Sequence, residues 1–192
     1  MARLTIGYVL ECASAEEWEE WLEANHDSAR EVWLRLAKKG SGAVTVTRAK
    51  ALETALMYGW IDGQAASQDD SYWLQRFTPR ARRSKWSKIN CEAAEDLIAA
   101  GRMKPGGFAA VEAAKSDGRW EAAYAPPSMM EAPADFLGKL KQNRAAQACF
   151  ERLDAQNRYA ILYRIADAKK QETRARRIEK FVGMLERGET IY

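Results

Sequence analysis

The fold of the N-terminal half is decided by two apolar segments and the polar residues between them: Gly59-Trp60-Ile61-Asp62-Gly63-Gln64, residues 65–71 and Tyr72-Trp73-Leu74-Gln75-Arg76-Phe77. Aromatic and β-branched residues are enriched in strands, and both outer segments are rich in them. The residues between them are small and polar, which is typical of a turn. The sequence therefore predicts a β-hairpin.

A further strand is predicted upstream of this hairpin. Apolar residues at positions 32, 34 and 36 alternate with Trp33 and Arg35, and a flexible segment with two glycines follows at residues 38–42. Alternation with a period of two is the pattern of a half-buried strand. We therefore expect a small antiparallel sheet of about three strands.

Two helices are predicted to flank the upstream strand. Ser14 and Glu17 have the spacing of a capping box, and apolar residues at i, i+3 and i+4 follow, which predicts a helix over residues 15–25. Thr47 is a suitable N-cap for a second helix, and Gly59 can end that helix in the left-handed conformation.

After Pro79 the apolar spacing becomes helical and stays so. Asn90 is predicted to cap a helix that ends at Gly101, and Pro105 is predicted to open another that ends at Gly118. Four further apolar stripes at helical spacing follow the last proline of the chain.

The prolines divide the chain. We expect an α+β domain over residues 1–125, a Pro-rich linker over residues 126–133 and a helical module over residues 134–192. The expected fold class is α+β and predominantly helical, with the small sheet packed against helices.

Composition excludes several classes of protein. Of 192 residues, 47% are hydrophobic and 30% are charged, an ordinary globular composition. No apolar run is long enough to cross a bilayer, so we expect no membrane span. The N-terminal apolar stretch is broken by Thr5 and Gly7 and stopped by Glu11, unlike a signal peptide. We therefore expect a cytoplasmic protein.

The sequence contains few residues suited to metal binding or to histidine-dependent catalysis. Cys12, Cys91 and Cys149 are far apart and form no C-x-x-C pair, so we expect them to be buried apolar residues. The single histidine, His26, lies among carboxylates and is expected at the surface. No nucleotide-binding or zinc-protease motif is present. We predict no catalytic residue, no metal and no cofactor.

Charge is distributed unevenly along the chain. Residues 1–31 contain eight acidic and two basic residues, whereas residues 71–91 contain six basic residues and no acidic one. This second segment includes the basic block, residues 76–90, whose cations suit phosphates or carboxylates and whose aromatic residues could stack on a base. Its candidate ligand-binding residues are Arg76, Arg80, Arg82, Lys85, Trp86 and Lys88. The alternative is a solvated turn, or one paired with the acidic helix that follows Ser14.

Three residues outside this block are further candidates. Asp62, between two glycines, is either a general base or arginine partner, or a turn residue that accepts backbone amides. Arg174 and Arg177 share one face of the last predicted helix, which is either an anion-docking strip or an ordinary solvent face.

Several short strings together resemble a known family. They occur in order along the chain: Gly59-Trp60-Ile61-Asp62-Gly63, Arg76-Phe77-Thr78-Pro79-Arg80, Ser84-Lys85-Trp86-Ser87-Lys88-Ile89-Asn90, Asp117-Gly118-Arg119-Trp120, Ala168-Lys169 and Glu172-Thr173-Arg174-Ala175-Arg176-Arg177-Ile178. This combination resembles the bacterial YdeI/OmpD-associated (OmdA-like) family of bacteriocin-protection proteins. The resemblance covers about residues 18–188 and implies that the segment after the prolines is the family's compact helical module. It implies no particular reaction.

The sequence thus favours a non-enzymatic cytoplasmic binding or stress-protection module. Its expected partner is an anionic ligand, peptide or protein held by the basic block. One alternative is nucleic-acid binding through the same block. The other is an enzyme that uses Asp62 with Arg80, although these two residues define no reaction class.

Overall fold

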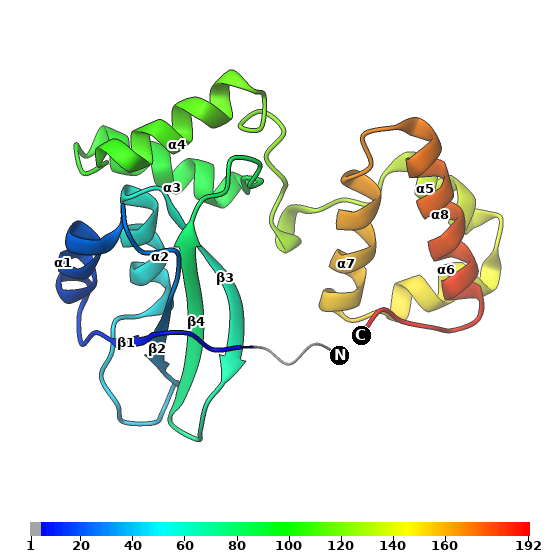
Figure 1. Cartoon of the computed structure of the whole chain (residues 1–192). Coiled ribbons are helices and arrows are strands. Elements are labelled where there is room, and N and C mark those ends of the chain that lie inside the picture. Colours follow the sequence, from blue (N-terminus) through cyan, green and yellow to red (C-terminus); the bar gives the residue numbers. More distant parts are fainter. Residues whose placement is uncertain (1–4) are drawn as a thin grey trace. The chain divides into compact units, whose positions relative to one another are not determined.

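The computed structural model describes residues 5–192 and divides into two compact units, with the boundary between Ala123 and Tyr124 (Figure 1). The first unit is built on a sheet and the second is helical. The predicted α+β, mainly helical class is confirmed. The described strands of the first unit are β1 (Val9–Glu11), β2 (Val32–Ala37), β3 (Trp60–Ser67) and β4 (Tyr72–Pro79), and its helices are α1 (Ala15–Asn25), α2 (Arg48–Met57), α3 (Lys88–Ala99) and α4 (Pro105–Ser116).

The sheet has the strand order β1-β2-β4-β3 and is mixed. The hairpin and β2 are antiparallel neighbours, as predicted. The sequence analysis missed β1, a three-residue strand that pairs in parallel with β2 and places Leu10 beside Leu34. The sheet therefore has four strands rather than about three, and it is not purely antiparallel.

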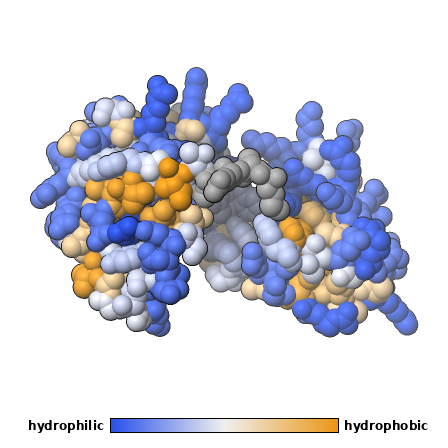
Figure 2. All heavy atoms as spheres, turned by 60° about the horizontal axis from the view of Figure 1, so that its bottom comes forward, coloured by the Kyte–Doolittle hydropathy of each residue, from blue (hydrophilic) through white to orange (hydrophobic). Residues whose placement is uncertain are grey.

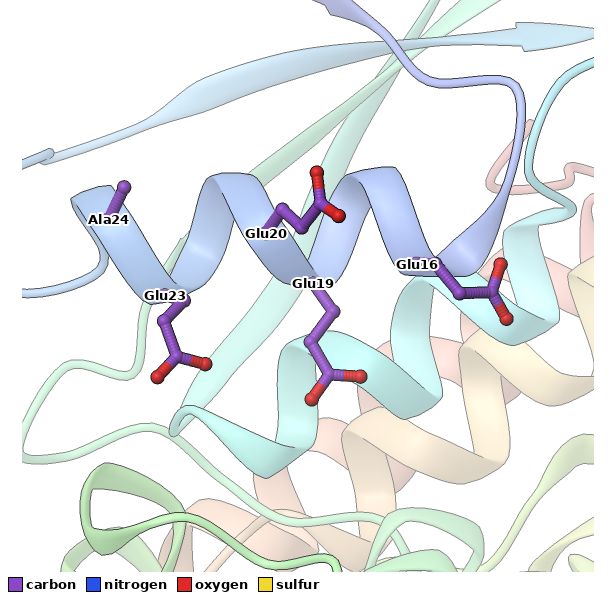
Figure 3. A pocket seen from close by; sticks show the side chains of 5 residues that line it. All are labelled: Glu16, Glu19, Glu20, Glu23 and Ala24. Carbon is purple, nitrogen blue, oxygen red and sulfur yellow. The ribbon is translucent and has the colours of Figure 1, made fainter.

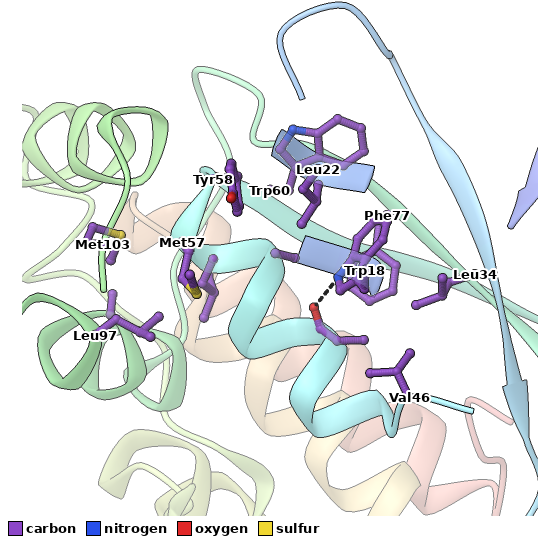
Figure 4. Packing of buried hydrophobic residues seen from close by; sticks show 14 of the residues in the cluster. Trp18, Leu22, Leu34, Val46, Met57, Tyr58, Trp60, Phe77, Leu97 and Met103 are labelled. Atoms are coloured by element: carbon purple, nitrogen blue, oxygen red, sulfur yellow. Dashed lines mark hydrogen bonds between the residues drawn. The ribbon is translucent and has the colours of Figure 1, made fainter. Parts of the chain in front are cut away.

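The helices α1 and α2 cover one face of this sheet (Figure 4). Trp18 and Leu22 of α1 are fully buried with Leu34 of β2 and Phe77 of β4. The indole Nε1 of Trp18 donates a hydrogen bond to the Ala51 carbonyl of α2 at 3.0 Å. This bond satisfies the polar group that the buried tryptophan carries and fixes α1 against α2.

The helix α3 begins earlier than predicted. Its N-cap is Ser87, whose Oγ accepts a hydrogen bond from the Asn90 amide at 3.2 Å, so the prediction that Asn90 caps the helix is wrong. The residue before the cap, Trp86, is only 2% exposed, and Cys91 is also buried. Apolar residues at these two positions fix the direction in which a chain enters a helix.

The start of α4 packs closely against the end of α2. Gly59 has a φ of +74°, as expected of a helix-ending glycine, and its position admits no side chain because a Cβ would lie 2.5 Å from the Gly106 carbonyl oxygen. A Cβ at Gly107 would lie 2.3 Å from the Met57 carbonyl oxygen. The two helices can approach this closely only because glycine has no side chain.

Replacing Gly107 with alanine is expected to lower the free energy of unfolding of the first unit by about 1–3 kcal/mol, since backbone must move to admit the methyl group. A denaturant titration followed by tryptophan fluorescence measures this. The matched control is Gly138→Ala in the second unit, where a Cβ would meet no heavy atom within 4 Å. This control is expected to stabilise its helix by about 0.5–1 kcal/mol, which amide hydrogen exchange over residues 134–141 measures, because the second unit contains no tryptophan. A neutral Gly107→Ala would show that α4 packs less closely than described.

The second unit runs from Tyr124 to Tyr192 and has its own core. The Pro-rich segment contains the short 3-10 helix η1, and four α-helices follow, as the four apolar stripes predict. The ring of Phe136 is fully buried and meets Phe150 edge-on, with centroids 5.2 Å apart. The elements of this unit are η1 (Pro127–Met129), α5 (Ala134–Lys141), α6 (Arg144–Arg152), α7 (Ala155–Ala166) and α8 (Gln171–Glu186).

A buried asparagine holds the last residues of the chain. Asn157 of α7 is 4% exposed, and its Oδ1 accepts hydrogen bonds from the amides of Ile191 and Tyr192 at 2.9 and 3.0 Å. Its Nδ2 donates to Asp154, which caps α7. Both polar ends of the amide are thus paired, which compensates for burying it.

All three cysteines are buried with free thiols, as predicted. Cys12 and Cys91 lie in the first unit and Cys149 in the second. Burial raises the thiol pKa of Cys12 and of Cys91 to about 11. They are therefore structural residues in the folded protein.

Most of the surface seen in Figure 2 is hydrophilic, with hydrophobic residues gathered over part of the first unit. Exposed large hydrophobic residues of this unit include Tyr8, Val9 and Val44. No helix within residues 5–192 is long and apolar enough to cross a membrane.

Candidate functional site

The basic loop, residues 80–87, joins β4 to α3 and is held at several points. The Arg80 amide donates to the Gly59 carbonyl at 2.9 Å, which ties the start of the loop to the turn before β3. Arg119 donates from Nη1 to the Ser84 carbonyl at 2.9 Å, which ties its middle to the segment after α4. Arg119 also pairs with Asp117 at 2.8 Å. The loop backbone is therefore fixed by hydrogen bonds.

The tip of the loop is a β-turn. The Ser84 amide donates to the Ala81 carbonyl at 2.8 Å, so Arg82 and Arg83 occupy the two central positions. Both side chains are exposed. Within residues 5–192 neither arginine forms an ion pair. Two guanidinium groups are thus presented to solvent on a fixed turn.

The base of the loop is a stack of cations and aromatic rings. The Arg80 guanidinium lies over the Trp86 ring, 3.6 Å from its centroid, and the Trp86 and Trp120 centroids are 4.8 Å apart. Lys115 lies 5.2 Å from the centre of the Trp120 ring. Contacts of this kind stabilise partly desolvated cations. Arg80 and Trp86 therefore anchor the two ends of the loop through contacts within the first unit.

The aromatic residues of the basic block face the interior. Phe77 is fully buried, Trp86 is 2% exposed, and Trp73 packs partly buried against the same core. The stacking faces that single-stranded nucleic acid would use are consequently occupied within the first unit. The exposed part of the block is cationic rather than aromatic and consists of Arg82, Arg83, Lys85 and Lys88.

Three of the candidate arginines form ion pairs inside their own units. Arg76 pairs with Glu31, the residue before β2, and is therefore not one of the exposed cations of the basic block. The other two lie on α8. Arg174 bonds Asp135 at 2.6 Å, and Arg177 lies 3.7 Å from Asp167. Arg177 also donates to the carbonyl of Arg164.

Asp62 has an arginine partner that sequence reasoning missed. It lies in β3, is about 15% exposed in its side chain and pairs with Arg48 from the first turn of α2. Its partner therefore comes from outside the basic block, and Arg80 is directed to Trp86 instead. This pair joins the sheet edge to α2.

The acidic helix α1 pairs with a lysine from another loop. Lys104 lies 3.4 Å from Glu19 and 3.6 Å from Glu23, and Tyr58 donates to Glu23 at 2.8 Å. This hydrogen bond and the Lys104 charge lower the pKa of Glu23, whereas burial raises that of Tyr58. Of the basic block, Arg76 pairs with Glu31, which follows this helix in the acidic N-terminal segment.

The same helix borders a surface pocket of about 510 Å³ (Figure 3). The residues that line it are four glutamates and one alanine: Glu16, Glu19, Glu20, Glu23 and Ala24. In the part of the chain from residue 5 onward, no group of three metal-binding side chains is placed to hold an ion. His26 is half-buried against Tyr58, with ring centroids 5.0 Å apart, rather than fully at the surface.

Comparison with protein families finds two matches. A domain of unknown function (DUF8412) matches residues 10–110, the part that contains the sheet, the basic loop and α3. The family described as "Bacteriocin-protection, YdeI or OmpD-Associated" (OmdA) matches residues 129–188, the helical unit. Its match begins within the Pro-rich segment and contains Pro133. Three of the six strings quoted above lie in the range of the first family, two lie in that of the second, and Asp117-Gly118-Arg119-Trp120 lies between the two ranges. No curated protein and no solved structure matches the chain.

Proposed function

From the chain's membership of the DUF8412 family through residues 10–110 and its OmdA domain over residues 129–188, we propose a non-enzymatic binding module of the bacteriocin-protection type. It acts in the cytoplasm and binds an anionic ligand, peptide or protein through the basic loop.

The observation that carries this proposal is the β-turn that presents Arg82 and Arg83. Its backbone is held by hydrogen bonds to Gly59 and Arg119, while both side chains face solvent without an ion pair in the described residues. Cations on an ordered backbone lose less conformational entropy on binding than cations on a mobile loop. The turn is therefore a prepared anion site.

The second unit favours the basic loop over α8 as the anion site. Its candidate arginines serve internal pairs, of which Arg174 with Asp135 is the shortest at 2.6 Å. In the first unit Asp62, whose side chain is about 15% exposed, is likewise engaged by Arg48. The arginines considered for anion docking on α8 and the carboxylate considered for catalysis thus stabilise the fold.

A thermal-shift screen of anionic metabolites, acidic peptides and oligonucleotides tests the proposal. A ligand that binds only the folded chain stabilises it by about 2.7 kcal/mol at a concentration 100 times its Kd. We expect at least one anion to raise the melting temperature of the first unit. We expect the rise to vanish in a variant with glutamine at positions 82, 83, 85 and 88.

The control removes charge elsewhere. Arg176 and Lys180 are exposed on α8, one turn apart, and their replacement by glutamine should leave the shift intact. A shift that survives loss of the loop cations would place the site elsewhere. Absence of any shift across the screen would contradict an anion-binding function.

A further inference from the structure

The basic surface at the loop is small because acidic residues lie at its borders. Lys88 opens α3, and Glu92 follows four positions later on the same helical face, with Glu95 and Asp96 also exposed. Asp117 also lies near the loop, and its pKa is lowered by the hydrogen bond from Arg119 and by the nearby charge of Arg82. The sign of the surface charge therefore reverses within about one helical turn of the loop.

This reversal disfavours an extended polyanion. A nucleic-acid backbone carries one charge every few ångströms, and its affinity comes from neutralising many phosphates at once. A strand longer than the loop would extend to the exposed carboxylate of Glu92 or to the ion pair of Asp117 with Arg119, and neither offers a net positive charge. The buried rings of Phe77 and Trp86 offer no stacking energy in compensation.

A single carboxylate is too weak a ligand for the same surface. Exposed pairs between one carboxylate and one cation contribute only about 0–1 kcal/mol, since water screens them. A phosphate monoester carries about −1.5 to −2 charges at neutral pH and has three acceptor oxygens. It can accept bidentate hydrogen bonds from two guanidinium groups together, which a carboxylate with two oxygens cannot.

From this geometry we propose that the β-turn of Arg82 and Arg83 binds one phosphate monoester group, with Lys85 adding charge. The inference rests on the proposed anion-binding function and specifies its ligand. The two arginines occupy adjacent central positions of one turn, so their forks can approach one phosphate from two sides. Because the neighbouring carboxylates repel longer anions, the site favours a compact dianion.

Amide chemical shifts of the full chain, recorded during titration, test this. The probes are a capped Gly-phosphoserine-Gly peptide, the same peptide with glutamate for phosphoserine, inorganic phosphate and a short DNA duplex. We expect the phosphopeptide to shift the amides of residues 80–88 and the glutamate peptide to bind at least about tenfold more weakly. We expect the duplex to bind no more tightly than the phosphopeptide.

The outcomes separate the two proposals. If inorganic phosphate and the phosphopeptide bind equally well, the site is supported and its ligand can be free phosphate. If the phosphopeptide binds more tightly, the site is supported and its ligand is a phosphorylated peptide. Tighter binding of the duplex at this loop, or equal binding of the glutamate peptide, overturns the phosphate inference and leaves anion binding in place. No shift of the loop amides with any probe overturns both.

Variants test the role of the guanidinium forks. Arg82→Gln with Arg83→Gln should lower phosphopeptide affinity at least about tenfold, whereas Arg176→Gln with Lys180→Gln removes equal charge from α8 and should not. Arg82→Lys with Arg83→Lys keeps the charge but loses bidentate geometry. We expect the phosphopeptide affinity of this lysine variant to lie between that of the Arg82→Gln, Arg83→Gln variant and that of the Arg176→Gln, Lys180→Gln control. Wild-type affinity in the lysine variant would show that the guanidinium groups are not needed and would overturn their assigned role.

Discussion

Replacing Trp60 with alanine is expected to lower the free energy of unfolding of the first unit by about 3–5 kcal/mol. Trp60 opens β3, is 1% exposed and meets Trp21 edge-on at 5.9 Å. Its Nε1 donates to the His26 carbonyl at 3.2 Å. The substitution thus removes a large buried ring and leaves that carbonyl without its donor, a loss comparable with much of a domain's total stability.

Denaturant unfolding followed by tryptophan fluorescence measures this loss, because all seven tryptophans precede residue 124 and report on the first unit. Two controls remove exposed side chains from the same unit: Tyr8→Ala, at a residue 61% exposed, and Arg82→Ala, at the loop tip. Both should change the midpoint little. A Trp60→Ala protein as stable as these controls would contradict the burial of the hairpin.

Replacing Phe136 with alanine is expected to destabilise the second unit by a similar amount, about 3–5 kcal/mol. Phe136 is fully buried in α5 and packs edge-on against Phe150 of α6. A unit of this size has a small core, so the loss of one central ring removes a large share of its stability.

Amide hydrogen exchange over α5–α8 resolves this effect from the first unit. The neighbouring residue Leu137 is 40% exposed on the same helix, so Leu137→Ala is a matched control with nearly the same position and helix propensity. We expect fast exchange in Phe136→Ala and near wild-type protection in Leu137→Ala. Equal protection in both variants would show that the ring is not central to the core.

Features that depend on local sequence were predictable. The helix over residues 15–25 begins at its capping box, with Ser14 accepting from the Glu17 amide and Glu17 accepting from the Ala13 amide. Thr47 and Pro105 likewise mark helix starts, as predicted. In each case the residues that decide the structure lie within one turn of it, so the pattern is visible in the chain.

Features that depend on distant partners were not predictable. The strand β1 has three residues, and its pairing with residues 33–35 uses main-chain groups that leave no side-chain pattern. Asp62 meets Arg48 because α2 packs beside β3, a contact that no local spacing indicates. The support of the basic loop by Arg119 was missed too, although the string Asp117-Gly118-Arg119-Trp120 had marked that segment.

The buried cysteines give the chain internal chemical probes of its own opening. A thiol must be exposed and ionised to react with an alkylating reagent, and the thiols of Cys12 and Cys91 are neither, with pKa values raised to about 11. Alkylation at neutral pH therefore proceeds through transiently opened molecules, and the alkylation rate of each thiol reports how often its surroundings open. Because Cys12 and Cys91 lie in the first unit and Cys149 in the second, mass spectrometry of the alkylated chain can time the opening of each unit separately, without any added label.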